Sequence, residues 1–200
     1  TNFTNSLLVG TDSTGTLNSA DGNTGVGTGV LGALTTGDNN VAVGLNALDL
    51  NTTGSENTAV GKVALCKNTT GIQNTAIGTN IMRQNTTGDQ NVALGYRALD
   101  ANTTADNNTA VGADALKANT TGSENTALGI CASGSNTTGT CNVALGRNAL
   151  FTTTTGAKNI AIGAAALFSN TTASSNTAVG DQSLLTNTTA SSNTAVGAQS

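Results

Sequence analysis

A five-residue phrase that returns every 17 residues limits what this chain can fold into more than any other feature. It reads Asn57-Thr58-Ala59-Val60-Gly61 in one copy, and it recurs with small substitutions at 23–27, 40–44, 74–78, 91–95 and onward to 193–197. A degenerate first copy stands at 6–10, which makes twelve copies without an insertion or deletion. A period this strict is typical of a solenoid, in which each repeat forms one coil that stacks on the next.

The residues of the repeat favour strands over helices. Each period carries glycine at one fixed place and often paired threonines, both of which are poor helix formers, and 17 residues leave little room for two helices. We therefore predict an all-β fold, a parallel β-solenoid (β-roll) of about twelve 17-residue coils, as a single domain over residues 1–200. At an inter-strand spacing of about 4.8 Å, twelve coils form a rod on the order of 50 Å long.

The composition predicts a thin core. Among 200 residues there are one Tyr, three Phe, no Trp and no Pro, fewer aromatic residues than a globular domain of this length carries. Abundant Gly, Asn and Thr with only 9% charged residues would also fit a disordered segment. We favour the solenoid because a disordered chain does not keep aliphatic residues in register over twelve periods.

Aligning the copies separates the repeat into columns, numbered so that Asn57 is position 1 and Gln73 is position 17. Position 5 is always glycine, which predicts a tight corner where φ is positive or a Cβ would clash. Position 4 is always Val, Ile or Leu and position 9 is usually Leu, so we expect both columns inside the coil, with position 2 on the same strand face as position 4. The predicted structural turn column includes Gly44, Gly61, Gly78, Gly95, Gly112, Gly129, Gly146, Gly163 and Gly180.

The charged residues and the alanines suggest a surface that another chain covers. All seven basic and eleven acidic side chains lie at positions 6, 7, 10, 11, 16 and 17, which must therefore face water. Position 3 should point outward by strand alternation, yet it is almost always alanine and never charged. We interpret this column as a self-association face, formed by Ala42, Ala59, Ala76, Ala93, Ala110, Ala127, Ala144, Ala161, Ala178 and Ala195.

A second phrase, Asn-Thr-Thr-Gly, occupies positions 12 to 15 in many coils. Asn and Gly favour a turn, and asparagines stacked in successive coils can link their amides along the axis, so we expect two ladders, at positions 1 and 12. The phrase also matches the N-glycosylation acceptor pattern at Asn51, Asn68, Asn85, Asn102, Asn119, Asn136, Asn170 and Asn187. The ladder is the preferred interpretation, since glycans on coils about 4.8 Å apart would collide.

No recurring catalytic or ligand-binding pattern is found in the repeats. The chain has no His, its carboxylates are scattered over outward positions, and it lacks both a phosphate-binding glycine spacing and the Asp columns of calcium-binding β-rolls. We expect no enzyme activity, no cofactor and no metal site. The cysteines Cys66, Cys131 and Cys141 lack the spacing of a zinc site. Free thiols are the preferred interpretation, but Cys131 and Cys141 fall within one period, so a disulfide between them is the alternative.

Charge and hydropathy narrow the partners and the location. The net charge of −4 does not provide the excess of positive charge that binding to nucleic acid or to an anionic membrane requires. No apolar run approaches the roughly 18 residues of a spanning helix, and no signal segment precedes the repeats, so membrane insertion is not expected in this segment. Since the chain begins at Thr1 and both ends lie in mid-pattern, we expect a fragment of a longer, extracellular fibrous protein.

The phrase at 57–61, followed by Ala64 and Leu65, resembles the head repeat of trimeric autotransporter adhesins, and similar repeats occur in phage and giant-virus tail or surface fibres. The resemblance covers residues 6–200. It implies a left-handed β-roll, three chains packed through small-residue faces, and adhesion of the head to host surfaces, through a receptor or a glycan. The repeat here is longer by the Asn-Thr-Thr-Gly turn, and no neck or coiled-coil stalk is present.

Three functions are consistent with these patterns. The first is a structural and adhesive fibre segment on a cell or virion surface, a stiff solenoid that self-associates, as a trimer, and presents variable surface positions for attachment. The second is an ice-binding β-solenoid that uses the threonine columns, among them Thr52, Thr69, Thr86, Thr103, Thr120 and Thr137. The third is a filament subunit that joins end to end through open strand edges.

Overall fold

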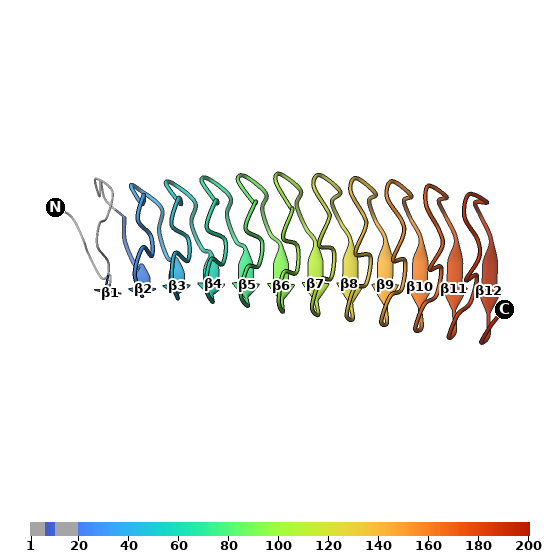
Figure 1. The fold of residues 1–200 in the computed structure, drawn as a ribbon. Helices are drawn as coiled ribbons and strands as arrows, with labels where there is room; N and C mark the ends of the chain where they lie inside the picture. The colour runs from blue at the N-terminus through green and yellow to red at the C-terminus, as the bar shows by residue number, and fades with distance from the viewer. Residues whose placement is uncertain (1–6, 11–19) are drawn as a thin grey trace.

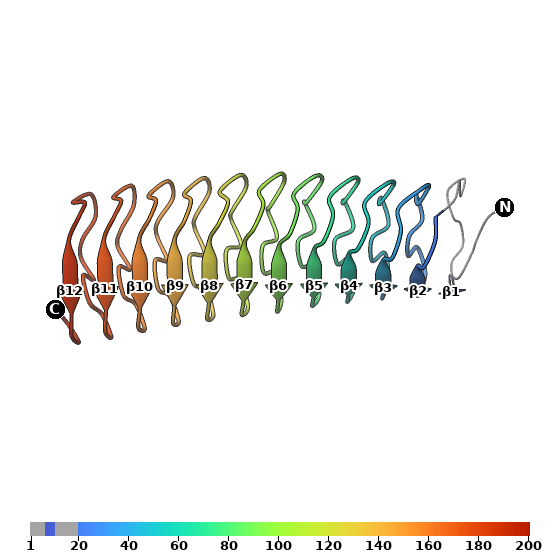
Figure 2. The same ribbon diagram turned by 180° about the vertical axis from the view of Figure 1, so that it is seen from behind.

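The fold is a rod of flattened coils, seen in a computed structural model that describes residues 7–10 and 20–200. The coils stack side by side along the rod, with the first and the last strand at opposite ends (Figure 1, Figure 2). Each coil contributes one three-residue strand. The strands are β1 (Leu7–Val9), β2 (Thr24–Val26), β3 (Val41–Val43), β4 (Thr58–Val60), β5 (Thr75–Ile77), β6 (Val92–Leu94), β7 (Thr109–Val111), β8 (Thr126–Leu128), β9 (Val143–Leu145), β10 (Ile160–Ile162), β11 (Thr177–Val179) and β12 (Thr194–Val196).

The twelve strands form one parallel sheet in sequence order. Neighbouring strands pair in register one repeat apart, so that Ala59 lies opposite Ala76. Backbone hydrogen bonds also join the coils outside the strands, for example from the amide of Thr52 to the carbonyl oxygen of Thr69 at 2.9 Å. The predicted all-β parallel solenoid with a 17-residue period is therefore confirmed.

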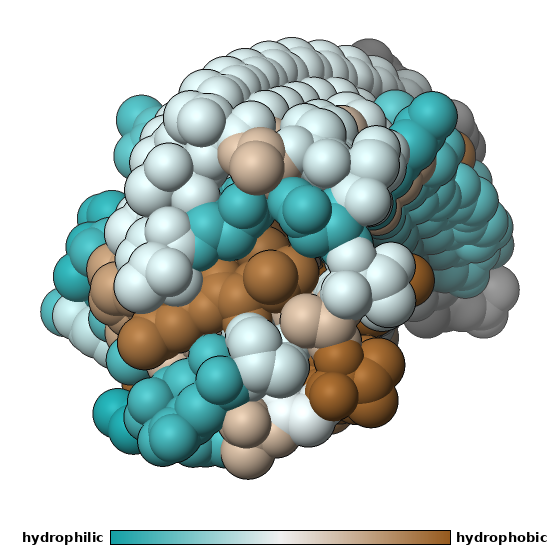
Figure 3. All heavy atoms as spheres, turned by 90° about the vertical axis from the view of Figure 1, so that its right-hand side faces the viewer, coloured by the Kyte–Doolittle hydropathy of each residue, from teal (hydrophilic) through white to brown (hydrophobic). Residues whose placement is uncertain are grey.

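The interior of each coil is narrow and is filled from two sides. After the glycine corner the chain returns through positions 8 to 11, which we call the return segment. Ala59 of the strand and Ala64 and Leu65 of the return segment are fully buried, and the equivalent residues of other coils join them in one continuous hydrophobic core. Viewed along the rod from its C-terminal end, hydrophobic residues occupy the middle of the coil (Figure 3).

The strands alternate as predicted, but with the opposite phase. In β6 the side chain of Ala93 is buried, whereas Val92 and Leu94 are 41 and 46% exposed. The expectation that positions 2 and 4 lie inside is therefore wrong, while position 9 lies inside as expected. The reason is volume: the return segment already brings a leucine and an alanine into the interior, so a closely packed core leaves room only for a methyl group on the facing strand.

Each coil turns sharply at its glycine column. Gly112 has a φ of 128°, and a Cβ on it would lie 2.6 Å from the carbonyl oxygen of Gly129 in the next coil. Positions 7, 9 and 17 also adopt the left-handed backbone conformation, although they carry side chains, as at Val63 with φ 59° and Leu65 with φ 50°. Left-handed residues of this kind are uncommon outside glycine, and here they bend a short repeat into a closed coil.

Two asparagine ladders run along the rod, as predicted. At position 1, Asn57 donates both its backbone amide and its side-chain amide to Oδ1 of Asn40, at 3.0 and 3.2 Å. At position 12, Asn68 donates its side-chain amide to Oδ1 of Asn51 at 2.8 Å. Asn57 and Asn68 also donate to one carbonyl oxygen, that of Gly71, at 2.8 and 2.9 Å. These bonds satisfy buried amides and join the two ladders within the coil, which fixes how neighbouring coils stack.

The described residues contain strands and turns and no helix, hence none that is long and apolar enough to cross a membrane. The left hand of the coil stays a prediction.

Candidate interaction surface

The outer side of the sheet is one continuous surface along the rod. It consists of the side chains at positions 2 and 4 of β1 to β12, which we call the strand face. Position 4 carries Val, Ile or Leu in every strand, and position 2 carries mostly Thr or Val. Ile77, Leu94 and Leu128 are 41, 46 and 47% exposed. The rod therefore presents a regular array of β-branched and aliphatic side chains to its surroundings.

Most of the exposed apolar residues gather on this face and at its margin. Of the fifteen large hydrophobic residues that are exposed in the described part of the chain, ten lie on the strand face: Leu7, Val9, Val26, Ile77, Val92, Leu94, Leu128, Ile160, Ile162 and Val196. Three more, Leu45, Tyr96 and Ile130, lie at position 6, just past the glycine corner. Exposed apolar residues that cluster along one side, instead of scattering singly, are typical of a surface that another molecule covers.

The strand face is uncharged and has the size of a protein interface. All charged residues of the chain lie at other positions, three of them, Lys62, Arg147 and Asp181, at position 6 on its margin. With about 4.8 Å between strands and about 3.3 Å per residue along them, the face and its position 6 margin span about 50 by 13 Å, or roughly 650 Å². A standard interface buries about 600–1,000 Å² on each partner. The face is therefore large enough to seat another rod.

The structure places the predicted self-association column elsewhere. From Ala42 to Ala178 these alanines are 0 or 1% exposed inside their own coils, and Ala195 is half-buried in β12. The expectation that this column faces outward is wrong, because alanine is the side chain that fits opposite the return segment. The outward uncharged columns are instead positions 2 and 4. Sequence reasoning missed them, although position 2 accepts Thr and Val alike, as expected of a half-exposed strand site.

The threonine column at position 13, considered for ice binding, is engaged within the rod. Oγ1 of Thr52 donates to the carbonyl oxygen of Thr69 at 2.9 Å, and the same bond recurs from Thr120 to Thr137 at 2.9 Å. A hydroxyl proton bonded inside the protein is not available to an ice surface. This column therefore serves as a third ladder, and thermal hysteresis is the measurement that tests ice binding.

The side of the rod away from the strand face carries a balanced set of charges. Positions 10 and 11 face away from the strands, because position 3 and positions 8 and 9 point into the same core. Nε and Nη2 of Arg83 lie 2.6 and 2.7 Å from the two carboxylate oxygens of Asp100, and this hydrogen bonding raises the pKa of Arg83. Arg97 and Lys117 lie 3.7 and 3.9 Å from Oδ1 of Asp114. Both carboxylates in this region thus face cationic partners.

The asparagines of the glycosylation pattern are occupied in the ladder. Seven of them are fully buried: Asn51, Asn68, Asn85, Asn102, Asn119, Asn136 and Asn170. The eighth, Asn187, is half-buried and donates its amide to Oδ1 of Asn170 at 3.3 Å. The three cysteines all lie among the described residues and are free thiols. Within that same part of the chain no group of three or more His, Cys, Asp or Glu side chains is placed to hold a metal ion.

Comparison of the chain with protein-family models, with curated proteins and with solved structures finds no match. The likeness of the repeat to adhesin and fibre repeats rests on the residues quoted for it.

Proposed function

We propose that the chain is a structural and adhesive segment of an extracellular fibre on a cell or virion surface. In this role the solenoid is a stiff rod, the strand face joins copies of the chain side by side, and the variable outward positions carry attachment. The observation that carries the proposal is the uncharged, apolar strand face, which lies outside a core that is already complete.

The rigidity of the rod supports the structural part of this proposal. Each coil is bonded to both neighbours by the parallel sheet, by the asparagine ladders and by the threonine ladder. Because these bonds recur in most of the described repeats, bending the rod would strain many of them at once. Such a rod is suited to hold an attachment site at a distance from its anchor.

Self-association follows from the cost of leaving the strand face in water. Apolar area removed from water contributes about 25 cal/mol per Å², so covering a face on the order of 650 Å² is a substantial gain before the cost of association. Three parallel rods can pack with their strand faces around a common axis. Every strand face is then covered in a closed, symmetric assembly. The resemblance to trimeric adhesin heads is the reason for preferring three copies.

Sedimentation velocity tests the proposal directly. One chain has a mass of 19.5 kDa, so a trimer should sediment as a species of about 58 kDa, three times that mass. The double variant Leu94→Lys with Leu128→Lys should yield monomers, because burying unpaired charges in an interface costs several kcal/mol. Thr87→Lys with Thr121→Lys places the same charges at exposed sites off the strand face and should leave the assembly intact. A parent chain that sediments cleanly as a monomer would overturn the proposal.

A further inference from the structure

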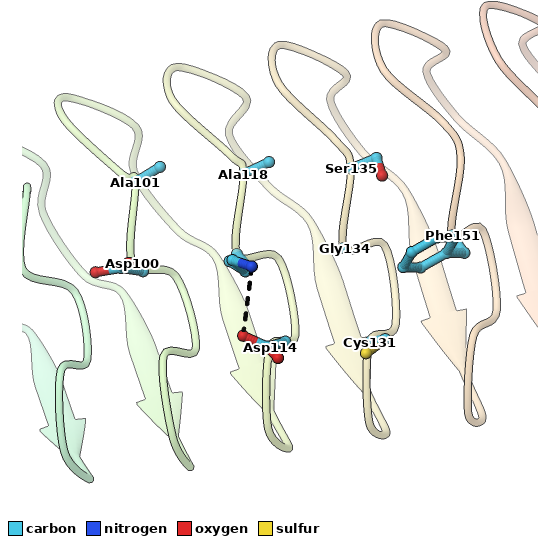
Figure 4. A pocket seen from close by; sticks show the side chains of 9 residues that line it. Asp100, Ala101, Asp114, Ala118, Cys131, Gly134, Ser135 and Phe151 are labelled. Atoms are coloured by element: carbon cyan, nitrogen blue, oxygen red, sulfur yellow. Dashed lines mark ion pairs between the residues drawn. The ribbon is translucent and has the colours of Figure 1, made fainter.

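A shallow pocket with a volume of about 470 Å³ opens over the return segments of consecutive coils, on the side of the rod away from the strand face. Small residues form its floor, with Ala118 and Ser135 at position 11 and Gly134 at position 10. Asp114 lies on one side of it and Phe151 on the other (Figure 4), and Lys117 also lines it. The pocket exists because the column at position 10 loses its side chain at Gly134.

Phe151 supplies the apolar wall of this pocket. One side of its ring stacks on Phe168, with the ring centroids 5.4 Å apart and the planes at 19°. Toward the pocket its ring lies over Gly134, where an added Cβ would stand 3.2 Å from Cε2 of Phe151. A glycine at this place therefore leaves the ring accessible from the pocket. A held aromatic ring beside an open hollow is a platform for a flat, apolar molecular surface.

Polar groups with unused hydrogen-bonding capacity surround the platform. Oδ1 of Asp114 is enclosed and accepts no hydrogen bond. The side chain as a whole is 31% exposed, so Oδ2 is the oxygen that faces outward. Nζ of Lys117 is 3.9 Å from that Oδ1, beyond hydrogen-bonding distance, so its donors stay available. The hydroxyl of Ser135 also lines the pocket (Figure 4). Asp114 and Lys117 thus lie across the pocket from the aromatic wall, and Ser135 lies in the coil between them and Phe151.

The charges around the pocket favour a neutral ligand. Asp100 is held by the bidentate contact from Arg83, and Asp114 faces Arg97 and Lys117. Neither an anion nor a cation would find an excess of opposite charge. The volume lies within the range of about 300–1,000 Å³ that is usual for small-molecule sites.

We propose that this pocket binds a neutral saccharide, whose ring presents an apolar face to Phe151 and hydroxyl groups to Asp114, Lys117 and Ser135. A sugar ring combines one apolar face with hydroxyl groups that donate and accept hydrogen bonds. This combination matches the aromatic wall and the polar groups of the pocket. The inference rests on the attachment role proposed above and names the class of ligand for it. Weak binding by one such site would be strengthened where several rods present it together.

Saturation-transfer NMR and calorimetric titration on the 200-residue chain test the site, with glucose, galactose, mannose, N-acetylglucosamine and lactose as probes. We expect at least one of them to bind with a Kd on the order of 1 mM. Phe151→Ala should weaken that binding about tenfold, as expected for the loss of an aromatic platform. Ala118→Gln should block the pocket and abolish binding, and Gln84 already occupies the same column. Ser169→Gln makes a similar change in this column outside the pocket and should leave binding unchanged.

Three results would overturn the inference. One is that none of the five saccharides binds, and another is that binding survives Ala118→Gln in a variant with the parent's circular dichroism spectrum. The third is that N-acetylneuraminic acid, added as a charged probe, binds while the five neutral saccharides do not, with an affinity that falls as salt rises, since that would indicate recognition of charge. Sedimentation of the same samples reports on the strand face separately: a monomer that binds a neutral saccharide in this pocket supports the saccharide site while removing the proposed assembly.

Discussion

Asn136 and Thr153 meet where the position 12 ladder is interrupted. Oδ1 of Asn136 is buried and has no hydrogen-bond donor, because the next coil carries Thr153 in place of an asparagine. The hydroxyl of Thr153 donates instead to the carbonyl oxygen of Asn170 at 3.2 Å. A buried acceptor without a donor costs about 1–3 kcal/mol, so this rung is a weak point in the rod.

Thr153→Asn should repair the ladder. The new side-chain amide can donate to Oδ1 of Asn136, and we expect the free energy of unfolding to rise by about 1 kcal/mol. Urea denaturation measures the change. The reverse change at an intact rung, Asn68→Thr, should lower stability by a similar or larger amount. A lower unfolding midpoint for Thr153→Asn would show that the unsatisfied oxygen is not what limits this rung.

Gly112→Ala should destabilise the rod by about 1–3 kcal/mol or more, because its left-handed φ of 128° and the carbonyl oxygen of Gly129 leave no place for a Cβ. Gly88→Ala is the matched control. A Cβ there would also approach a carbonyl oxygen of the next coil, that of Ala105, but the φ of Gly88 is not left-handed and alanine already occupies this column at Ala105 and Ala173. If the melting temperature falls equally for both variants, the positive φ of Gly112 is not the cause of the strain.

Val63→Asn should stabilise the chain by about 1 kcal/mol. Val63 is β-branched and holds a φ of 59°, a conformation that asparagine tolerates far better. Asn46 and Asn80 hold φ values of 54° and 56° in the same column of the neighbouring coils. The mirror variant Asn80→Val should lose a comparable amount. Calorimetry on both variants checks the pair, and a shift of the same sign in both would speak against backbone strain as the cause.

The buried asparagines of the Asn-Thr-Thr phrase should carry no glycan in the folded rod. Asn68, for example, is fully buried and donates its amide within the ladder, which leaves no room for a sugar on that nitrogen. Intact-mass measurement of folded chain secreted from a glycosylating host should give the unmodified mass for these seven sites. A glycan found at any of them in chain that remains folded would refute the ladder at that rung. Asn187, which is half-buried, is outside this prediction.

Cys66 should make the rod less stable at alkaline pH. Burial raises the pKa of its thiol above the ordinary 9.0, and Sγ donates to the carbonyl oxygen of Arg83 at 3.6 Å. The unfolded chain therefore loses this proton at a lower pH than the folded chain, so stability falls as pH rises through the unfolded pKa and stops falling above the folded one. Comparing the parent with Cys66→Ala over this range isolates the effect, which is absent if both lose stability in parallel.

The periodic features of the fold follow from the sequence by local arguments. A glycine at the same place in every repeat predicts a corner, and the described glycines of that column do turn the chain with positive φ. Asparagines in fixed columns predict ladders, because identical side chains stacked one repeat apart can bond only along the axis. The corners and the ladders depend only on residues that recur one repeat apart, and not on what lies across the coil.

Whether Ala59 or Val60 faces the core was decided only by the tertiary structure. Strand alternation predicts that the two side chains point to opposite sides, and a one-residue change of phase exchanges the sides. The larger aliphatic residue was expected inside, but the interior opposite Ala59 is already filled by Ala64 and Leu65. The repeat, the corners and the ladders follow from the amino-acid sequence alone. The volume left between two walls decided which side of the strand is core and which is surface, and with it the location of the candidate interface.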